Sequence, residues 1–219
     1  MYVAAALAGL RQITMGFEMF PARANPILAE WVAGGLTEEE FLLRVDWASV
    51  WGFPAELYMP LFHFCRDMQI PMIGLNVKRD LVRSVGASGW DGTSDDLKEG
   101  LTRPAVSPMA YRRFIFELTG GSRPDRKAQA PDDPAFDNFV AAQEVWDRAF
   151  ASRLADSVAQ NPDRLAIGVM GKGHIQYGGG VPWQLRDLGL AESFVAVPAD
   201  MDELCDPNAA DATMLLRNP

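Results

Sequence analysis

A lysine, a histidine and a tyrosine share one short glycine-rich segment of this 219-residue chain. Lys172, His174 and Tyr177 follow directly after the apolar stretch 165–170 and precede three consecutive glycines. Ligands of parallel sheets bind beyond the carboxyl ends of the strands, and glycine lets backbone approach a ligand closely, so the segment predicts a binding site. The competing interpretation is a connecting loop whose histidine is only hydrogen-bonded. A nucleotide site is not predicted, because neither Gly-x-Gly-x-x-Gly nor the Walker pattern is present.

Two more polar residues are predicted at the carboxyl ends of strands. Glu18 lies near the end of one short apolar stretch, and Asn76 ends another. Such stretches alternate with segments of helical periodicity, which indicates an α/β fold with a mostly parallel sheet and helices on both faces, in a single domain over residues 1–219. Because the carboxyl ends of parallel strands meet at one edge, we expect Glu18, Asn76 and His174 to converge there.

Periodicity and cap signals predict the elements that position these residues. Thr37 and Glu40 form a capping-box pattern, and Asn25 and Ser107, each followed by proline, are predicted helix caps. The predicted helices cover 3–12, 25–34, 54–69, 79–85, 107–118, 135–160 and 181–188, with another beginning at 37; the predicted strands cover 14–20, 71–76, 165–170 and 194–197; and 120–134 is a predicted exposed loop. The side chains predicted to face the core are Leu57, Leu61, Phe64 and Met68 in the helix 54–69, and Phe139, Ala142, Val145, Trp146, Phe150, Leu154 and Val158 in the helix 135–160.

Composition excludes several classes of protein. With 48% hydrophobic residues and a formal net charge of −9, the chain is predicted to be globular and is not predicted to bind nucleic acid or anionic membranes in general. Cys65 and Cys205 fit no zinc spacing and no disulfide framework. No apolar run reaches the ~18 residues of a membrane span, and the first ten residues lack the basic start of a signal peptide.

Five segments, in this order along the chain, resemble the ChaN-like haem-binding proteins. They are Gly16-Phe-Glu-Met-Phe, Trp51 with Tyr58 and Pro60, Gly74-Leu-Asn, the stretch 142–151 (Ala-Gln-Glu-Val-Trp-Asp-Arg-Ala-Phe-Ala), and the stretch 171–182 around His174. The wider superfamily includes the Tiki metalloproteases, the TraB proteins and the erythromycin-esterase-like proteins. The resemblance implies a haem-binding protein of iron acquisition, related to lipoproteins, dimeric, and either periplasmic or membrane-anchored.

The resemblance also implies how haem would be held. A tyrosine would bind the iron, while basic and histidine side chains would bind the propionates, because a tyrosinate oxygen suits ferric iron. Tyr177 is the first choice for the iron ligand, Tyr58 the second, and Tyr111 the remaining candidate. Lys172 and His174, with Lys78 and Arg79, are predicted to reach the propionates. Gln143 and Asp147 share one face of a helix in the family's Gln-x-x-Trp-Asp signature and are expected to face the site.

One family feature is missing from the chain as it stands. Family members carry a strand that ends in a Gly-Glu-x-His segment before the first helix, and this chain begins inside that helix. The resemblance therefore predicts an absent strand that would pair with 14–19, association into a homodimer, and membrane association through the missing segment. The alternative function is a metal-dependent hydrolase that holds a divalent ion with His174 and Glu18, but two ligands are too few for a tight catalytic site. A binding protein is favoured over an enzyme.

Overall fold

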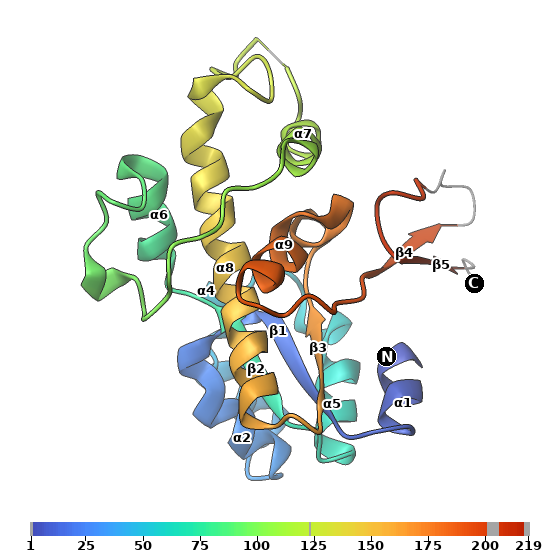
Figure 1. The fold of residues 1–219 in the computed structure, drawn as a ribbon. Helices are drawn as coiled ribbons and strands as arrows, with labels where there is room; N and C mark the ends of the chain where they lie inside the picture. The colour runs from blue at the N-terminus through green and yellow to red at the C-terminus, as the bar shows by residue number, and fades with distance from the viewer. Residues whose placement is uncertain (1, 123, 201–205, 217–219) are drawn as a thin grey trace. The chain divides into compact units, whose positions relative to one another are not determined.

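The computed structural model describes residues 2–122, 124–200 and 206–216, in two compact units (Figure 1). The first unit comprises residues 1–77 and 153–170, and the second comprises 78–152 and 171–219. The long helix α8, Asp137–Gln160, contributes to both units. Cys205 lies outside the described residues.

The first unit contains a parallel three-stranded sheet. Strand β1 (Ile13–Pro21) lies between β2 (Met72–Asn76) and β3 (Leu165–Val169), with Met15 opposite both Met72 and Ile167. The three strands expected from the sequence are confirmed, and so is the parallel α/β class. The predicted pairing of β1 with an absent strand is wrong, because both edges of β1 are occupied and the edge strands are β2 and β3.

Helices cover both faces of this sheet, and the alternation of side chains along β1 explains how (Figure 1). Met15 and Phe17 are buried in the main core against α2 (Asn25–Val32) and α5 (Met59–Asp67). Gly16 points to the opposite face, where a Cβ would approach Leu154 of α8 to 3.1 Å. A larger residue than glycine at this position would therefore push the end of α8 away from the sheet.

Aromatic rings form most of the core beneath β1. They come from β1, from the helices α2, α3 (Glu38–Arg44), α4 (Trp47–Val50) and α5, and from the residue just before α5. Most pairs pack edge to face or tilted and two are stacked, at centroid distances of 4.6 to 6.5 Å. The rings are Phe17, Phe20, Trp31, Phe41, Trp47, Tyr58 and Phe62. The remaining elements of this unit are α1 (Tyr2–Ala8) and two short 3-10 turns, η1 (Ala22–Ala24) and η2 (Ala55–Leu57).

The helix predicted over 54–69 is broken, and its buried face was predicted only in part: Leu61 and Phe64 are half-buried against the core, as expected. The chain forms η2 and then begins α5 at Met59, with Pro60 in the first turn. Proline starts a helix readily but cannot continue one, so the face periodicity does not run through Tyr58. The buried residues of α5 are Met59, Phe62 and Cys65, whereas Leu57 and Met68 are 68% and 58% exposed.

One of the three predicted caps is confirmed. Thr37 caps α3 in a reciprocal capping box with Glu40. Asn25 lies inside the first turn of α2, and its side chain instead accepts a hydrogen bond from the Gly74 backbone N–H at 2.7 Å. Ser107 makes no cap bond either, because Pro108 is the N-cap residue of α7 (Met109–Leu118). A long-range partner decided the correction at Asn25, and local sequence does not reveal it.

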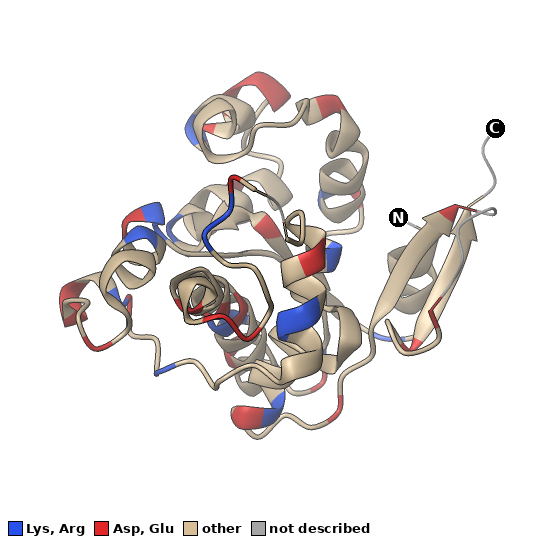
Figure 2. Cartoon of the chain, turned by 90° about the horizontal axis from the view of Figure 1, so that it is seen from above, with Lys and Arg blue, Asp and Glu red and all other residues tan. Residues whose placement is uncertain are grey.

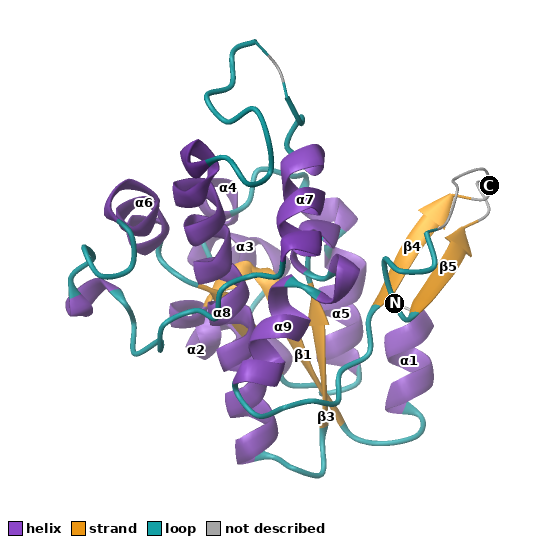
Figure 3. Cartoon of the chain, turned by 45° about the horizontal axis from the view of Figure 1, so that its top comes forward, coloured by secondary structure: helices purple, strands orange, loops and turns teal. Residues whose placement is uncertain are grey.

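The second unit is mostly helical (Figure 3). It contains α6 (Arg79–Ser88), α7, the first part of α8 and α9 (Gly180–Asp187), with 3-10 turns at Asp95–Leu97, Pro134–Phe136, Lys172–His174 and Gln176–Gly178. Its two strands, β4 (Ala196–Asp200) and β5 (Ala212–Leu216), pair in parallel in a separate sheet. The predicted strand 194–197 is therefore shifted, and β5 was not predicted.

Two further expectations, for α8 and for the loop that precedes it, are modified. On α8, Val145, Phe150 and Leu154 are buried as predicted, but Phe139 is 43% exposed. The segment 120–133 forms no helix or strand in its described part, yet it is anchored, because the Arg126 guanidinium donates to the Phe116 and Gly121 carbonyls at 3.0 Å. Among the described residues, no helix has the length and hydropathy to cross a membrane.

Candidate functional site

A buried tyrosine lies among several of the predicted site residues of the second unit. Tyr111 on α7 is fully buried, and its hydroxyl lies 2.6 Å from the Gly173 carbonyl oxygen and 2.9 Å from Asp147 Oδ2. Gln143 Nε2 lies 3.3 Å from the same hydroxyl. Burial, and then the nearby Asp147 carboxylate, raise the pKa of Tyr111 far above its usual range. Tyr111 therefore keeps its proton and is a hydrogen-bond donor inside the unit, not a candidate iron ligand.

The carboxylate beside Tyr111 also holds the histidine of the glycine-rich segment. Asp147 is 0% exposed, and its Oδ1 lies 2.7 Å from Nδ1 of His174. The imidazole packs against Phe150 at a centroid distance of 5.0 Å and against Trp146 at 6.3 Å. The structure thus brings together Gln143, Asp147 and His174, three of the residues predicted for the site, around Tyr111, which the sequence analysis had named only as the remaining candidate for the iron ligand.

The glycines after His174 serve packing within the unit, which modifies the expectation that they admit a ligand. A Cβ on Gly179 would overlap the ring and Cβ of Tyr111, well inside van der Waals contact. A Cβ on Gly180, whose φ is +56°, would collide with the His174 carbonyl oxygen and lie 3.0 Å from the Tyr111 hydroxyl oxygen. The glycine run is therefore required where the chain wraps around Tyr111.

Tyr177 lies in the same segment but in a different environment. It is half-buried, its backbone adopts a left-handed φ of 57°, and its ring lies 4.9 Å from that of Phe114. The backbone N–H donates to the Ala209 carbonyl at 3.0 Å, and the phenol donates to the Asp206 carboxylate. Partial burial and then Asp206 raise the pKa of Tyr177. Its phenol is therefore protonated at neutral pH unless a ligand displaces the proton.

The other predicted site residues are divided between the two units. Lys172, Lys78 and Arg79 are exposed residues of the second unit. Glu18, Asn76 and Tyr58 belong to the first unit, where Asn76 Nδ2 donates to the Glu18 carbonyl oxygen at 2.9 Å and Tyr58 packs in the aromatic core. Glu18 and Asn76 lie in the first unit, whereas His174 lies in the second. Their predicted convergence therefore stays a prediction.

The described residues do not form a metal site. They include no group of three or more histidine, cysteine, aspartate or glutamate side chains placed to hold a metal ion. His63 Nε2 lies 3.0 Å from Glu38 Oε2, and the centroid of its ring lies 5.2 Å from that of Trp31. His63 therefore packs as an ordinary helix residue. Cys65 is buried beside Met15, and burial raises its pKa to about 12, so its thiol is a poor ligand.

A second network in this unit was missed by the sequence reasoning. Arg148 is buried; its guanidinium donates to Asp187 Oδ2 at 2.6 Å and to Thr102 Oγ1, and it lies 3.3 Å from Gln184 Oε1. Gln184 is fully buried and exchanges two hydrogen bonds with the backbone of Ala105. The network ties α8, α9 and the segment before α7 together. Its only sequence signal is the arginine that follows the Gln-x-x-Trp-Asp signature.

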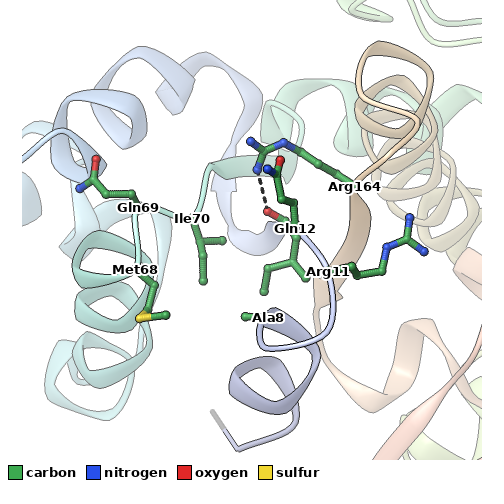
Figure 4. A pocket seen from close by; sticks show the side chains of 8 residues that line it. Ala8, Arg11, Gln12, Met68, Gln69, Ile70 and Arg164 are labelled. Atoms are coloured by element: carbon green, nitrogen blue, oxygen red, sulfur yellow. Dashed lines mark hydrogen bonds between the residues drawn. The ribbon is translucent and has the colours of Figure 1, made fainter.

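A pocket of about 240 Å³ occurs in the first unit, at the amino ends of β1 and β3 (Figure 4). Arg164 donates to the Ile13 carbonyl and Arg11 to the Asp163 carbonyl, so the two guanidinium groups tie the strands to each other. The Arg11 side chain points away from Met68, which lines the opposite side (Figure 4). This pocket lies at the amino ends of the strands, not at the carboxyl ends where a ligand was predicted.

Basic and acidic side chains are interspersed along the described elements (Figure 2). Lys and Arg together number 20 and Asp and Glu number 29, and neighbouring elements carry both signs.

Residues 1–185 match the sequence profile of the family described as "Haem-binding uptake, Tiki superfamily, ChaN". This chain belongs to that family. The match includes both His174 and Tyr177, and it confirms the family expected from the five spaced segments. The ChaN family is a haem-binding family, so haem is the ligand to consider for this chain.

Three individual proteins are similar to this ChaN family member. RETICULATA-RELATED 5, a chloroplastic protein of Arabidopsis thaliana, is 23% identical over 171 residues, which are 77% of this chain but only 23% of that relative's length. The structure of ChaN of Campylobacter jejuni with cofacial haem has a TM-score of 0.67 at 16% identity, over 95% of this chain and 75% of that one, which shows the same fold. A mutant of the erythromycin esterase EreC in its open conformation reaches a TM-score of 0.44 at 12% identity, over 87% of this chain and 62% of that one, a likeness too weak to inform the site.

A buried acid next to the site gives a testable pH dependence. Burial raises the pKa of Glu144, whose Oε1 accepts from the Ser107 N–H at 2.6 Å. A carboxyl whose folded-state pKa is raised favours the folded state when protonated, so this contribution is lost as the pH rises through that pKa. Glu144→Gln keeps an acceptor without the charge. We expect the variant to exceed the wild type in free energy of unfolding at pH 7 and to converge with it below about pH 4.

Urea unfolding followed by circular dichroism at a series of pH values measures this difference. The exposed Glu117, changed to glutamine, is the matched control and should leave the pH profile unaltered. If the free energies of unfolding of Glu144→Gln and the wild type differ by the same amount at every pH, the expected effect of Glu144 is absent.

Proposed function

We propose that this chain binds haem through Tyr177, with His174 and Lys172 as partners of the propionates, and that it serves iron acquisition as a homodimer. Family membership supports the ligand. The observation that carries the site is that a half-buried phenol, Tyr177, lies three residues from an imidazole held by a fully buried carboxylate. Tyr58 is the second choice for the iron ligand.

The residues present fit haem in their chemistry. A phenol oxygen becomes a hard anionic ligand when it loses its proton, which suits the ferric iron that bound haem would supply. Among the tyrosines of the second unit, Tyr111 is fully buried and bonded within the protein, whereas Tyr177 retains exposure. In the free protein Tyr177 keeps its proton and donates a hydrogen bond to the Asp206 carboxylate. Binding to iron therefore requires release of that proton and of the hydrogen bond to Asp206.

Tyr177→Phe tests the iron ligand directly. The substitution removes only the oxygen and keeps the ring contact with Phe114, so the fold should persist. We expect the absorption spectrum of the ferric haem complex to lose its tyrosinate character and the affinity to fall by at least about tenfold, or about 1.4 kcal/mol.

Tyr58→Phe is the matched control, since it makes the same change in the other candidate tyrosine. It should leave both the spectrum and the affinity unchanged. If Tyr58→Phe abolishes the tyrosinate spectrum and Tyr177→Phe does not, the assignment to Tyr177 is wrong. A wild-type chain that binds no haem would refute the proposed function itself.

A further inference from the structure

We propose that the turn at residues 206–209 is an autoinhibitory latch, which holds Tyr177 in the free protein and must release its phenol before that phenol can bind haem iron. This inference rests on the proposed function and adds to it a control on access to the iron ligand. The turn and Tyr177 belong to the same compact unit, so the structure defines the contacts between them. The turn also lies beyond residues 1–185, which match the family profile, so the family match does not account for it.

The turn contacts Tyr177 at two points. The Tyr177 backbone N–H donates to the Ala209 carbonyl oxygen at 3.0 Å, and the phenol donates to the Asp206 carboxylate. Asp206 and Ala209 are themselves joined, because the Ala209 N–H donates to the Asp206 carbonyl oxygen at 3.1 Å. Phe114 of α7 packs against the tyrosine ring, with 4.9 Å between the ring centroids. Tyr177 is therefore held at its backbone, its ring and its hydroxyl.

The turn has internal hydrogen bonds that orient its carboxylate. The Asn208 N–H donates to Asp206 Oδ1 at 2.8 Å, and Asn208 Nδ2 donates to the same oxygen at 3.1 Å. Pro207 follows Asp206, and aspartate followed by proline is a favoured start of a β-turn. Residues 206–208 are exposed, whereas Ala209 is buried. The carboxylate that meets the phenol is thus positioned by the turn itself and remains accessible to solvent.

Tyr177 is held in a way that permits release. Tyr177 is half-buried and Asp206 is exposed, so water can replace both partners of their hydrogen bond at small cost. The Tyr177 φ of 57° is uncommon for any residue but glycine, and strained backbone of this kind occurs in switch regions. Tertiary contacts, such as the hydrogen bond to Ala209, maintain this conformation. The fully buried Tyr111 hydroxyl has no such access to water.

The latched phenol and an iron-bound phenol exclude each other. In the latch the oxygen keeps its proton and donates it in a hydrogen bond, whereas an oxygen that binds iron as tyrosinate has released that proton to solvent. A tyrosinate beside Asp206 would bring two negative charges together, and burial and then Asp206 already raise the pKa of Tyr177. The fraction of molecules in which the latch is open therefore limits the affinity for haem.

Asp206→Ala tests the latch, because it removes the acceptor of the phenol and leaves the tyrosine in place. We expect the variant to bind ferric haem at least about threefold more tightly than the wild type, since the latch no longer competes with iron. Asp206→Asn retains an acceptor oxygen and should show a smaller gain. Asp132→Ala removes another exposed carboxylate of the same unit and is the matched control, with unchanged affinity. Unchanged or weaker binding by Asp206→Ala, or an equal gain in Asp206→Asn, would overturn the proposal.

The Tyr177→Phe background shows whether Asp206 acts through the phenol. Phenylalanine has no hydroxyl to donate to Asp206, so Asp206→Ala should not change haem binding in this background. A gain of the same size as in the presence of the tyrosine would overturn the latch, because Asp206 would then act on the ligand directly.

The latch can also be measured without haem, which separates its failure from that of the proposed function. Carbon-13 NMR of labelled tyrosine follows the ionisation of each phenol, and the Tyr177 signal is the one absent from Tyr177→Phe. Asp206→Ala should lower the pKa of Tyr177, whereas Asp132→Ala should not. If neither the wild type nor Asp206→Ala binds haem, the proposed function is refuted, and the titration still decides whether Asp206 holds the phenol. Haem binding with a tyrosinate spectrum in the wild type, and no gain in folded Asp206→Ala, refutes the latch alone.

Discussion

Gly180→Ala is expected to lower the free energy of unfolding by about 3 kcal/mol. The new Cβ would collide with the carbonyl oxygen of His174, and the backbone φ of +56° is unfavourable for alanine by itself. Gly179→Ala should cost a similar amount, because its Cβ would overlap Tyr111, a fully buried ring with no room to move. Urea unfolding followed by circular dichroism measures both effects.

Gly86→Ala is the matched control in the same unit. Gly86 lies within α6, and its Cβ would meet Ala142 at 3.5 Å, which is ordinary van der Waals contact. Alanine favours helix over glycine, so this variant should be as stable as the wild type or more stable by up to about 1 kcal/mol. If Gly180→Ala unfolds at the same urea concentration as the wild type, the glycine run does not wrap around Tyr111 in the way described.

Arg148→Met is expected to cost about 3 kcal/mol. The substitution keeps an unbranched apolar chain but removes the buried guanidinium that donates to Asp187 and Thr102, and breaking one side of a buried ion pair typically costs this much. The loss should be at the lower end of the usual range, because Asp187 is 45% exposed and can be rehydrated. The free energy of unfolding in urea is again the measurement.

Arg83→Met supplies the comparison for Arg148→Met. Arg83 forms an exposed pair with Asp80 at 3.8 Å, and exposed pairs of this kind contribute little to stability. Its replacement should change the free energy of unfolding by less than about 0.5 kcal/mol. Similar values for the two arginine variants would mean that the Arg148 network does not stabilise the second unit.

The sequence was most informative where the determining forces are local. The capping box at Thr37 depends on residues three apart, and the three strands of the first sheet depend on short apolar runs, so both were predicted correctly. The resemblance through the Gln-x-x-Trp-Asp signature placed Gln143 and Asp147 at the site, and this assignment stays a prediction. Their partner His174 was also predicted for the site, although the contact between them was not.

Predictions that depended on distant partners were wrong or incomplete. Asn25 carries a good capping side chain, but Gly74, far along the chain, takes its oxygen. The face of α5 was displaced, because Pro60 begins a new helix and thereby resets the periodicity. The second parallel pair, β4 with β5, was not predicted, because β5 is a short, half-exposed apolar run whose pairing with β4 depends on the tertiary structure.

The sequence by itself determined the α/β class and the family, because the first follows from short apolar runs that alternate with helical periodicity and the second from residue types in five segments along the chain. Only the tertiary structure decided the role of Tyr111. This residue is 36 positions from Asp147 and 62 from Gly173, and side chains so far apart meet only when helices pack. Burial keeps the Tyr111 phenol protonated. It also leaves the Asp147 carboxylate dependent on partners inside the protein.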